Sequence, residues 1–423
     1  MLPRHVGVAL AVCLALASGR ALANGRYPNA DMLVVDPGDP SHLVMRTTFG
    51  TLVSRDGGQS WRWICEESIG YVDGDPALTV LAGGRTLHAF LGSIVLSSDD
   101  ACSYAAMPFD AQGRFVVDVT LDSADPSHAW VLTSGFMGRR EASMLDVSAA
   151  GTSVTVASSD FVPATLEVAR SRPDRIYIVG FDADFQSTLL VTDDRGKSWV
   201  SRPITPYPLL PMYLSAIDPN DPDTLYVRVD DGPSDHLLVS HDAGQSFSDV
   251  LTIGADMLGF ALSPDGSRVA AGGPGDGLYV ANTSDLTFAR AAQVQSLRCL
   301  TWTEGGLFAC AQESLDQWTV AVSSDLGQSF APLWHVQDLV PLECSAGSPV
   351  ENTCPRAWLD IASRIGADLV PGQNDDDPVL QPIKRSGGSS CALGSSESTG
   401  VPSLGLPALA VAALLLRRRS PGR

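Results

Sequence analysis

Short hydrophobic runs alternate with polar, turn-forming octets along most of this 423-residue chain. The runs GTLVS, TLLVT, HLLVS and TVAVS lead into the octets SRDGGQSW, TDDRGKSW, SHDAGQSF and SSDLGQSF. Runs of about five aliphatic and β-branched residues, bounded by Asp, Gly and Ser, are typical of strands that end in tight turns. The pattern therefore predicts a chain built from many short strands.

The octets (residues 54–61, 192–199, 240–247 and 323–330) share the order Ser/Thr, any, Asp, any, Gly, any, Ser, aromatic. The Asp carboxylate can accept hydrogen bonds from following N–H groups, and Gly allows a positive φ. The aromatic residue can start the next strand and bury its ring between sheets. Structural roles in turns are therefore predicted for Asp56, Asp194, Asp242 and Asp325. A degenerate copy, SSDDACSY (97–104), adds Asp99, and weak remnants lie near Asp146 and in TSDLTF (283–288).

A second repeat has a different phase. VVDPGDPSHLVM, TLDSADPSHAWVL, AIDPNDPDTLYVRV and ALSPDGSRVAAG each place a Pro/Asp turn between two hydrophobic runs, about twenty residues ahead of an octet position. Octet starts near 54, 97, 146, 192, 240, 283 and 323 are 40 to 49 residues apart. Four short strands in a period of this length indicate a β-propeller blade. We therefore predict an all-β fold: a single seven-bladed β-propeller of four-stranded antiparallel blades over residues 24–340.

The octets resemble the Asp-box (BNR) repeats of the sortilin/sialidase-like superfamily, and the resemblance covers nearly the whole body of the chain. It implies that each octet is the outer turn of a blade, between its third and fourth strands. It also implies that these turns lie on the face away from any ligand site.

Both ends of the chain differ from this body. Residues 1–23 combine Arg4, a short apolar stretch and the A-x-A sequence at 21–23, which is the pattern of a cleaved signal peptide. Residues 371–400 form a linker rich in Gly, Ser and acids, and residues 401–423 form a short apolar helix followed by an Arg cluster. This three-part ending resembles a MYXO-CTERM sorting tail. The resemblance implies processing near Cys391 by a membrane protease, and a protein that is secreted or held at the cell surface, touching the membrane only through its tail.

The formal net charge of −20 excludes some partners. An acidic body repels nucleic acid and anionic membrane surfaces. An extracellular domain with no nucleic-acid partner is therefore expected.

Six cysteines lie between the signal and Cys391, and an even number in an exported protein predicts disulfides. A hairpin centred on residues 304–305 places Cys299 opposite Cys310, within bridging distance. Cys344 with Cys354 then closes a short loop in a cap (341–370) with one helix at 356–365, which leaves Cys65 with Cys102. No zinc-ligand spacing is present, so no metal or cofactor is predicted.

The candidate binding residues lie in the loops between second and third strands, which share one face of a propeller with the loops between blades. Loops carry function more often than strands. The candidates are Arg139 and Arg140 in blade three, Asp182 and Asp184 in blade four, and Asp230, Asp231 and Asp235 in blade five. Such a face could bind a sugar, a cation or a protein.

Three functions follow from these loops. A noncatalytic binding platform for protein or glycan is favoured, since the loops are short and sortilin-like receptors use similar propellers for binding. A glycoside hydrolase, sialidase- or xyloglucanase-like, is the alternative, with two of the carboxylates as its acid and base or nucleophile. The early Arg-Ile-Pro motif of sialidases is missing, and the chain has room for one propeller only. A passive envelope component is the third interpretation.

Overall fold

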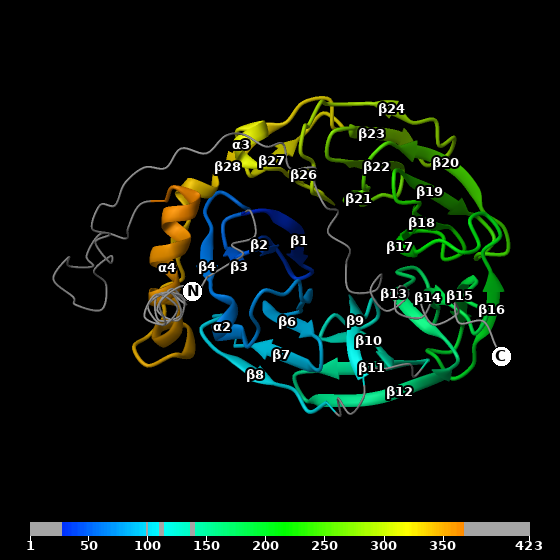
Figure 1. Ribbon diagram of the computed structural model, residues 1–423, viewed down its shortest axis with the longest axis horizontal. Helices are drawn as coiled ribbons and strands as arrows, with labels where there is room; N and C mark the ends of the chain where they lie inside the picture. Colours follow the sequence, from blue (N-terminus) through cyan, green and yellow to red (C-terminus); the bar gives the residue numbers. More distant parts are fainter. Residues whose placement is uncertain (1–27, 99, 110–113, 136–139, 368–423) are drawn as a thin grey trace, which may run out of the picture.

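The computed structural model describes residues 28–98, 100–109, 114–135 and 140–367, which form a closed ring of seven antiparallel sheets (Figure 1). Each sheet contains four consecutive strands, so the predicted seven-bladed β-propeller is confirmed. The predicted signal peptide, linker and sorting tail lie outside the described residues, as do Asp99, Arg139 and Cys391.

In every blade the four strands follow one another in chain order from the inner to the outer edge. Blades 1 and 2 contain β1 (Ala30–Asp36), β2 (Asp39–Thr47), β3 (Gly50–Ser54) and β4 (Arg62–Ile64), then β5 (Ala77–Leu81), β6 (Arg85–Phe90), β7 (Ser93–Ser97) and β8 (Tyr104–Ala106). Blades 3 and 4 contain β9 (Arg114–Leu121), β10 (His128–Gly135), β11 (Glu141–Ser148) and β12 (Gly151–Ser159), then β13 (Val162–Val168), β14 (Ile176–Phe181), β15 (Ser187–Thr192) and β16 (Val200–Pro203). Blades 5 and 6 contain β17 (Met212–Ile217), β18 (Leu225–Asp230), β19 (Asp235–Ser240) and β20 (Ser248–Ile253), then β21 (Gly259–Leu262), β22 (Arg268–Gly273), β23 (Gly277–Asn282) and β24 (Ala289–Arg290). Blade 7 contains β25 (Cys299–Thr303), β26 (Gly306–Cys310), β27 (Val320–Ser323) and β28 (Ala331–Trp334).

The middle strands of a blade are buried on both sides, because each blade packs between two neighbours. All residues of β3 and β15 are buried, for example. Leu189 and Val191 of blade 4 share a hydrophobic core with Leu225 and Val227 of blade 5. Strands covered on both faces are continuously hydrophobic rather than alternating. This burial accounts for the uninterrupted runs that precede the octets.

Hydrogen bonds to the octet aspartates hold the third and fourth strands of four blades together at their ends. In the first octet, Asp56 accepts bonds from the Ser54 hydroxyl (2.8 Å), the Ser60 N–H (2.9 Å) and the Ser60 hydroxyl (2.6 Å). Equivalent bonds reach Asp194, Asp242 and Asp325. Bonds to these charged carboxylates favour their ionised form. They lower the pKa of Asp194, Asp242 and Asp325 to about 2.

Blades 2 and 3 depart from the octet pattern. In blade 2, Asp100 accepts the bonds from the Ser98 hydroxyl (2.6 Å) and the Cys102 N–H (3.0 Å). Asp100 therefore accepts octet-like bonds in this turn, whereas the role predicted for Asp99 concerns a residue outside the described part of the chain. The remnant predicted near Asp146 is wrong, because Asp146 lies inside β11 and contacts His128 Nδ1 at 2.6 Å.

Asp242→Asn tests the octet carboxylates through the pH dependence of stability. A carboxyl with a folded pKa of about 2 stabilises the fold above its unfolded pKa near 4. That contribution disappears as the pH falls through about 2. The difference in unfolding free energy between wild type and variant should therefore be constant above pH 4 and shrink toward pH 2. Guanidinium titrations from pH 6 to 2 measure it, with Asp338→Asn as an exposed control. A difference that stays constant to pH 2 contradicts the assignment.

The ring closes without strand exchange, since β1 to β4 are consecutive in the chain. Blade 7 meets blade 1 directly, where the Thr301 hydroxyl donates to the Leu33 carbonyl (2.8 Å) and Arg298 pairs with Asp31 (2.7 Å). Beyond blade 7, β29 (Val340–Pro341) adds a parallel fifth strand to β4, the outer strand of blade 1. The chain after the propeller thus returns to the first blade.

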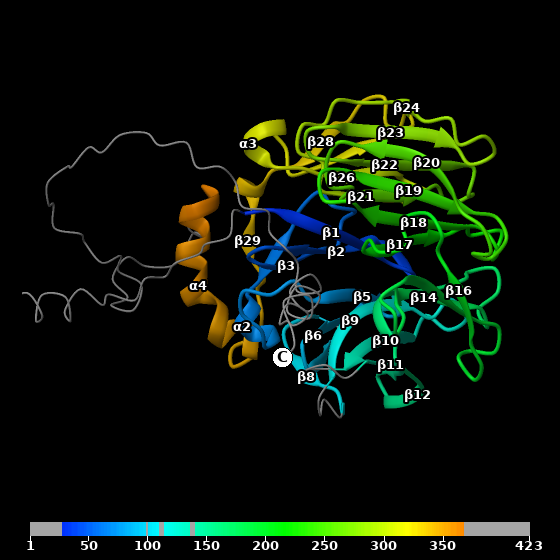
Figure 2. The ribbon, with the colours of Figure 1, turned by 45° about the vertical axis from the view of Figure 1, so that its right-hand side comes forward.

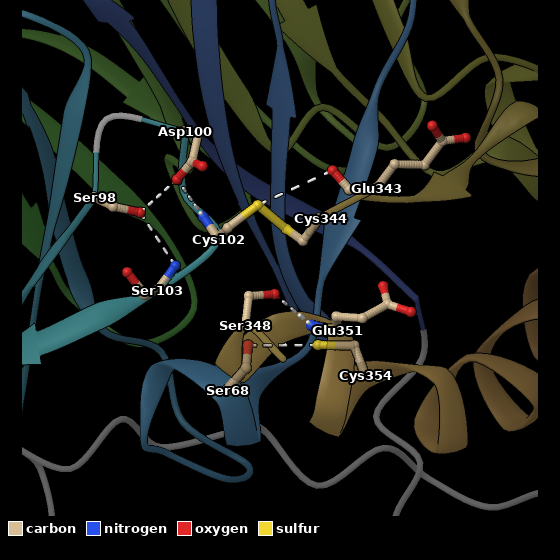
Figure 3. Close-up of a disulfide and its surroundings, with 10 residues drawn as sticks. All are labelled: Ser68, Ser98, Asp100, Cys102, Ser103, Glu343, Cys344, Ser348, Glu351 and Cys354. Atoms are coloured by element: carbon tan, nitrogen blue, oxygen red, sulfur yellow. Dashed lines mark hydrogen bonds between the residues drawn. A yellow bond between two sulfur atoms is a disulfide. The ribbon is translucent and has the colours of Figure 1, made fainter. Parts of the chain in front are cut away.

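Two disulfides fasten this returning segment. Figure 3 shows the bond between Cys102 and Cys344, and the second joins Cys65 to Cys354. The predicted pairs Cys344–Cys354 and Cys65–Cys102 are therefore wrong, whereas Cys299–Cys310 is confirmed. Sequence proximity suggested the wrong pairs, but ring closure brings residues more than 240 positions apart into contact.

Helices are few and short, apart from one at the ring's edge. They are α2 (Glu66–Ile69), α3 (Glu313–Asp316), the 3-10 helix η1 (Val336–Asp338) and α4 (Pro349–Ile365). The last helix begins at Pro349, seven residues before its predicted start, after a Ser348 cap. Its buried face includes Cys354, Trp358 and Ile361, and Figure 2 shows it beside β29 and α2. Within the described part of the chain, no helix has the length and hydropathy needed to span a bilayer.

Candidate functional site

The two faces of the ring carry different kinds of connection. Octet turns lie beside the turns between first and second strands, as three backbone bonds show: Gly57 N–H to Ser41 O, Arg195 N–H to Asp174 O and Ala243 N–H to Asp223 O. Because the strands of a blade are antiparallel, the opposite face receives the loops between second and third strands and the loops between blades. We call this second face the loop face. All candidate binding residues belong to it.

In blade 4, Asp182 holds its own loop together. Its carboxylate accepts bonds from the N–H groups of Asp184 and Gln186, both at 2.9 Å. Asp184 remains exposed at the tip of the loop. Phe185, in the same loop, has a positive φ of 59° and lies under the Arg140 guanidinium, 4.3 Å from the ring centre. The loops of blades 3 and 4 are therefore joined by a cation–π contact.

In blade 5, the three predicted aspartates have different surroundings. Asp235 is 1% exposed and accepts bonds from Arg228 Nε (2.6 Å) and the Met257 N–H (2.5 Å). Burial raises the pKa of the Asp235 carboxyl, although Arg228 opposes the shift. Asp230 accepts the Gly232 N–H at 2.9 Å, and Asp231 is exposed. Two of the three thus stabilise loops.

The predicted acids of blades 4 and 5 have separate hydrogen-bonding partners. Within the described residues, no hydrogen bond or ion pair joins Asp182 or Asp184 to the aspartates of blade 5. The same part of the chain contains no group of three His, Cys, Asp or Glu side chains arranged to hold a metal ion.

A polar cluster between blades 4 and 5 was missed by the sequence reasoning. The Tyr207 hydroxyl donates to Asp249 at 2.7 Å, and His236 Nδ1 lies 3.0 Å from the same oxygen. The rings of Tyr207 and His236 are 4.5 Å apart, and Asp231 is 3.8 Å from His236 Nε2. The bond to Asp249 raises the pKa of Tyr207 to about 12. No sequence motif marks this cluster, since it joins an interblade loop to two strands.

Two further acids lie on the innermost strands. Asp118 of β9 accepts the Leu166 N–H at 2.9 Å, and Glu167 of β13 accepts the Thr120 hydroxyl at 3.1 Å. Burial raises the pKa of Asp118 to about 7, and burial with the Asp118 charge raises that of Glu167 to about 8. Their signal in the sequence is an acid inside a hydrophobic run, FVVDVTL or ATLEV. Their bonds link the inner strands of blades 3 and 4.

Four of the seven large hydrophobic side chains that are exposed among the described residues lie on the loop face, spread around the ring. Val72 (65% exposed) and Leu209 (63%) lie in interblade loops. Leu91 (64%) and Leu315 (49%) lie in the second-to-third-strand loops of blades 2 and 7. Such side chains offer apolar contact area to a partner, although only a contiguous patch would mark a binding surface by itself.

Comparisons with known proteins support the fold. No protein-family model matches the sequence, and no curated protein sequence matches it. Among solved structures, the chain is similar to a puromycin-hydrolyzing peptidase of Mycobacterium tuberculosis, with a TM-score of 0.54, 14% identity and coverage of 75% of this chain and 55% of the peptidase. The β-propeller domain of Myceliophteria thermophila Cps50 (Swd1) gives a TM-score of 0.48 and 14% identity over 68% of this chain and 94% of that domain. YCF48 bound to a D1 peptide gives 0.48 and 15% over 68% and 92%. At such identities the likeness extends to the propeller fold alone.

Proposed function

We propose that this chain is an exported, cell-surface Asp-box propeller that binds another protein through its loop face and catalyses no reaction. The observation that carries the proposal is the set of exposed apolar side chains on this face: Val72, Leu91, Leu209 and Leu315. They are spread around the ring, so they suit a broad partner better than a small molecule in a pocket.

The carboxylates favour binding over hydrolysis. Asp182, Asp230 and Asp235 each accept a backbone N–H from a neighbouring loop residue. Such bonds favour a fixed structural role, whereas a glycosidase needs two carboxyl groups facing one substrate. A glycan is the second candidate ligand, because the adjacent rings of Tyr207 and His236 lie beside two carboxylates, with Tyr207 bonded to Asp249 and His236 close to Asp231.

A charge-insertion experiment tests the proposal. In the full exported chain, Val72 and Leu209 are replaced together by Asp, and in the matched control Asp replaces Val200 and Leu326, which are exposed but lie away from the loop face. Cell-envelope proteins of the native host and a panel of polysaccharides and sialosides are the probes. We expect the loop-face variant to lose at least about tenfold in affinity for a protein partner, since buried charge replaces apolar contact. The control should bind as wild type does.

The same assay contains the outcomes that contradict the proposal. If the loop-face variant and the control lost the same affinity, the partner would not bind through the loop face. Reducing-end release abolished by Asp184→Asn or Asp230→Asn would show a glycoside hydrolase. No binding to any probe would favour a passive envelope component.

A further inference from the structure

The outer strands of the blades are edge strands, with unpaired N–H and C=O groups along one side. Natural proteins protect such edges by shortness, charge, proline or a covering segment. Six of the seven outer strands in this ring have such protection. β8 and β24 have three and two residues; β16 contains Arg202 and Pro203; β20 contains Asp249; β28 contains Pro332; and β4 is covered by β29.

The seventh outer strand, β12, is long, uncharged and free of proline, and no described segment covers it. Its one irregularity is a bulge at Thr155, since Val154 pairs with Leu145 and Val156 with Met144. It spans nine residues, Gly151–Ser159, with the sequence GTSVTVASS, so it contains no charged residue and no proline. β12 pairs with β11 along its length, from Ser148 opposite Gly151 to Glu141 opposite Ser159. Figure 1 shows it on the perimeter of the ring. Val154, in its N-terminal half, is 60% exposed.

The outer edge of β12 is left open by the part of the chain that the structure describes. Among the described residues, no backbone hydrogen bond joins it to any strand other than β11. Blade 1 shows that an outer edge of this propeller can accept another strand, since β29 pairs with β4 there. An open uncharged edge of nine residues is a template for the same kind of addition.

We propose that β12 pairs antiparallel with β12 of a second copy of this chain, forming an eight-stranded sheet across a twofold axis. Antiparallel pairing of one strand with itself satisfies the symmetry of a dimer whose two surfaces are identical. The cross-strand pairs contain only Gly, Ser, Thr, Val and Ala, so no like charges oppose each other despite the net charge of −20.

The charges at the ends of β12 also favour this arrangement. Asp160 follows the strand, and its N–H donates to the Arg140 carbonyl at 2.7 Å. In an antiparallel pair, Asp160 of each copy lies beside the start of the other strand, near Ala149 and Ala150, which carry no charge. A parallel pair would place the two Asp160 side chains together. The geometry therefore favours the antiparallel dimer.

A charge-reversal pair of variants tests the dimer. In a pair centred on Thr155, Val154 of one copy lies diagonally across the twofold axis from Val154 of the other, so Val154→Glu and Val154→Lys each bring like charges close together. Sedimentation equilibrium of the full exported chain should give a wild-type dimer with a dissociation constant on the order of micromolar, since pairing along one strand makes a small interface. Each variant alone should dimerise at least about tenfold more weakly, and an equimolar mixture of the two should recover the dimer, because Glu then lies diagonally across the axis from Lys. Val200→Glu, an equally large change at an exposed site in blade 4, is the control.

A wild-type chain that remains monomeric to about 100 μM would overturn the inference. A wild-type dimer that Val154→Glu does not weaken would also overturn it. So would a mixture of the two variants that stays monomeric although both variants unfold at the wild-type temperature. Thermal unfolding of each variant by circular dichroism separates a lost interface from a lost fold.

Discussion

Replacing Cys65 and Cys354 together by alanine should lower the free energy of unfolding by about 3–5 kcal/mol. The bridge joins residues 289 positions apart. A cross-link over so long a loop removes much conformational entropy from the unfolded chain. Cys102–Cys344 still joins the same two regions in this variant, which limits the loss. Removing both bridges should therefore cost more than either alone, because β29 and α4 are then held only by packing.

Guanidinium unfolding without reductant measures these losses. The control replaces Cys299 and Cys310, which are 11 residues apart and already face each other in the β25–β26 hairpin. Its expected cost is smaller, about 2–3 kcal/mol. Limited proteolysis adds a second readout, since only the variant without both long-range bridges should be cut early between blade 7 and α4. If the variant without Cys299–Cys310 lost as much stability as the variant without both long-range bridges, the long-range bridges would not hold the C-terminal segment on blade 1.

Trp358→Ala should cost about 3–5 kcal/mol, the usual loss for a fully buried aromatic side chain. Trp358 is 0% exposed, and its ring centre is 5.5 Å from that of Trp63 in β4. It lies one helical turn after Cys354, so it packs α4 onto blade 1 beside the disulfide. Removing it leaves a cavity at the contact that closes the ring.

Two matched variants distinguish packing from helix formation. Trp358→Phe keeps most of the aromatic volume and should lose clearly less stability than the alanine variant. Asp360→Ala changes an exposed residue of the same helix, whose ion pair with Arg364 (3.3 Å) is worth little at the surface. Chemical denaturation of the three proteins provides the comparison. Equal losses in all three would mean that α4 is not held by Trp358.

The candidate site could be predicted only in part. Position in the sequence assigned Asp182, Asp184 and Asp230 to one face, because loop order in an antiparallel blade fixes the face. It did not show that Asp182 and Asp230 hold turns, since their partners depend on local backbone geometry. The Tyr207–His236–Asp249 cluster lay beyond prediction, because it brings together residues up to 42 positions apart through packing between blades.

The sequence by itself determined the repeating unit of this protein. The octets and the Pro/Asp turns recur every 40 to 49 residues, and each turn is specified by its own Asp, Gly, Ser or Pro residues. Counting these repeats therefore gives the number of blades and of strands. The hairpin pair Cys299–Cys310 also followed from the sequence, but the pairing of Cys65, Cys102, Cys344 and Cys354 was decided by the tertiary structure. Cys65 and Cys354 meet because seven blades complete a circle and return the C-terminal segment to blade 1, a contact that no local pattern encodes. The open edge of β12 is a property of the same kind, because only the assembled ring shows which strands remain uncovered.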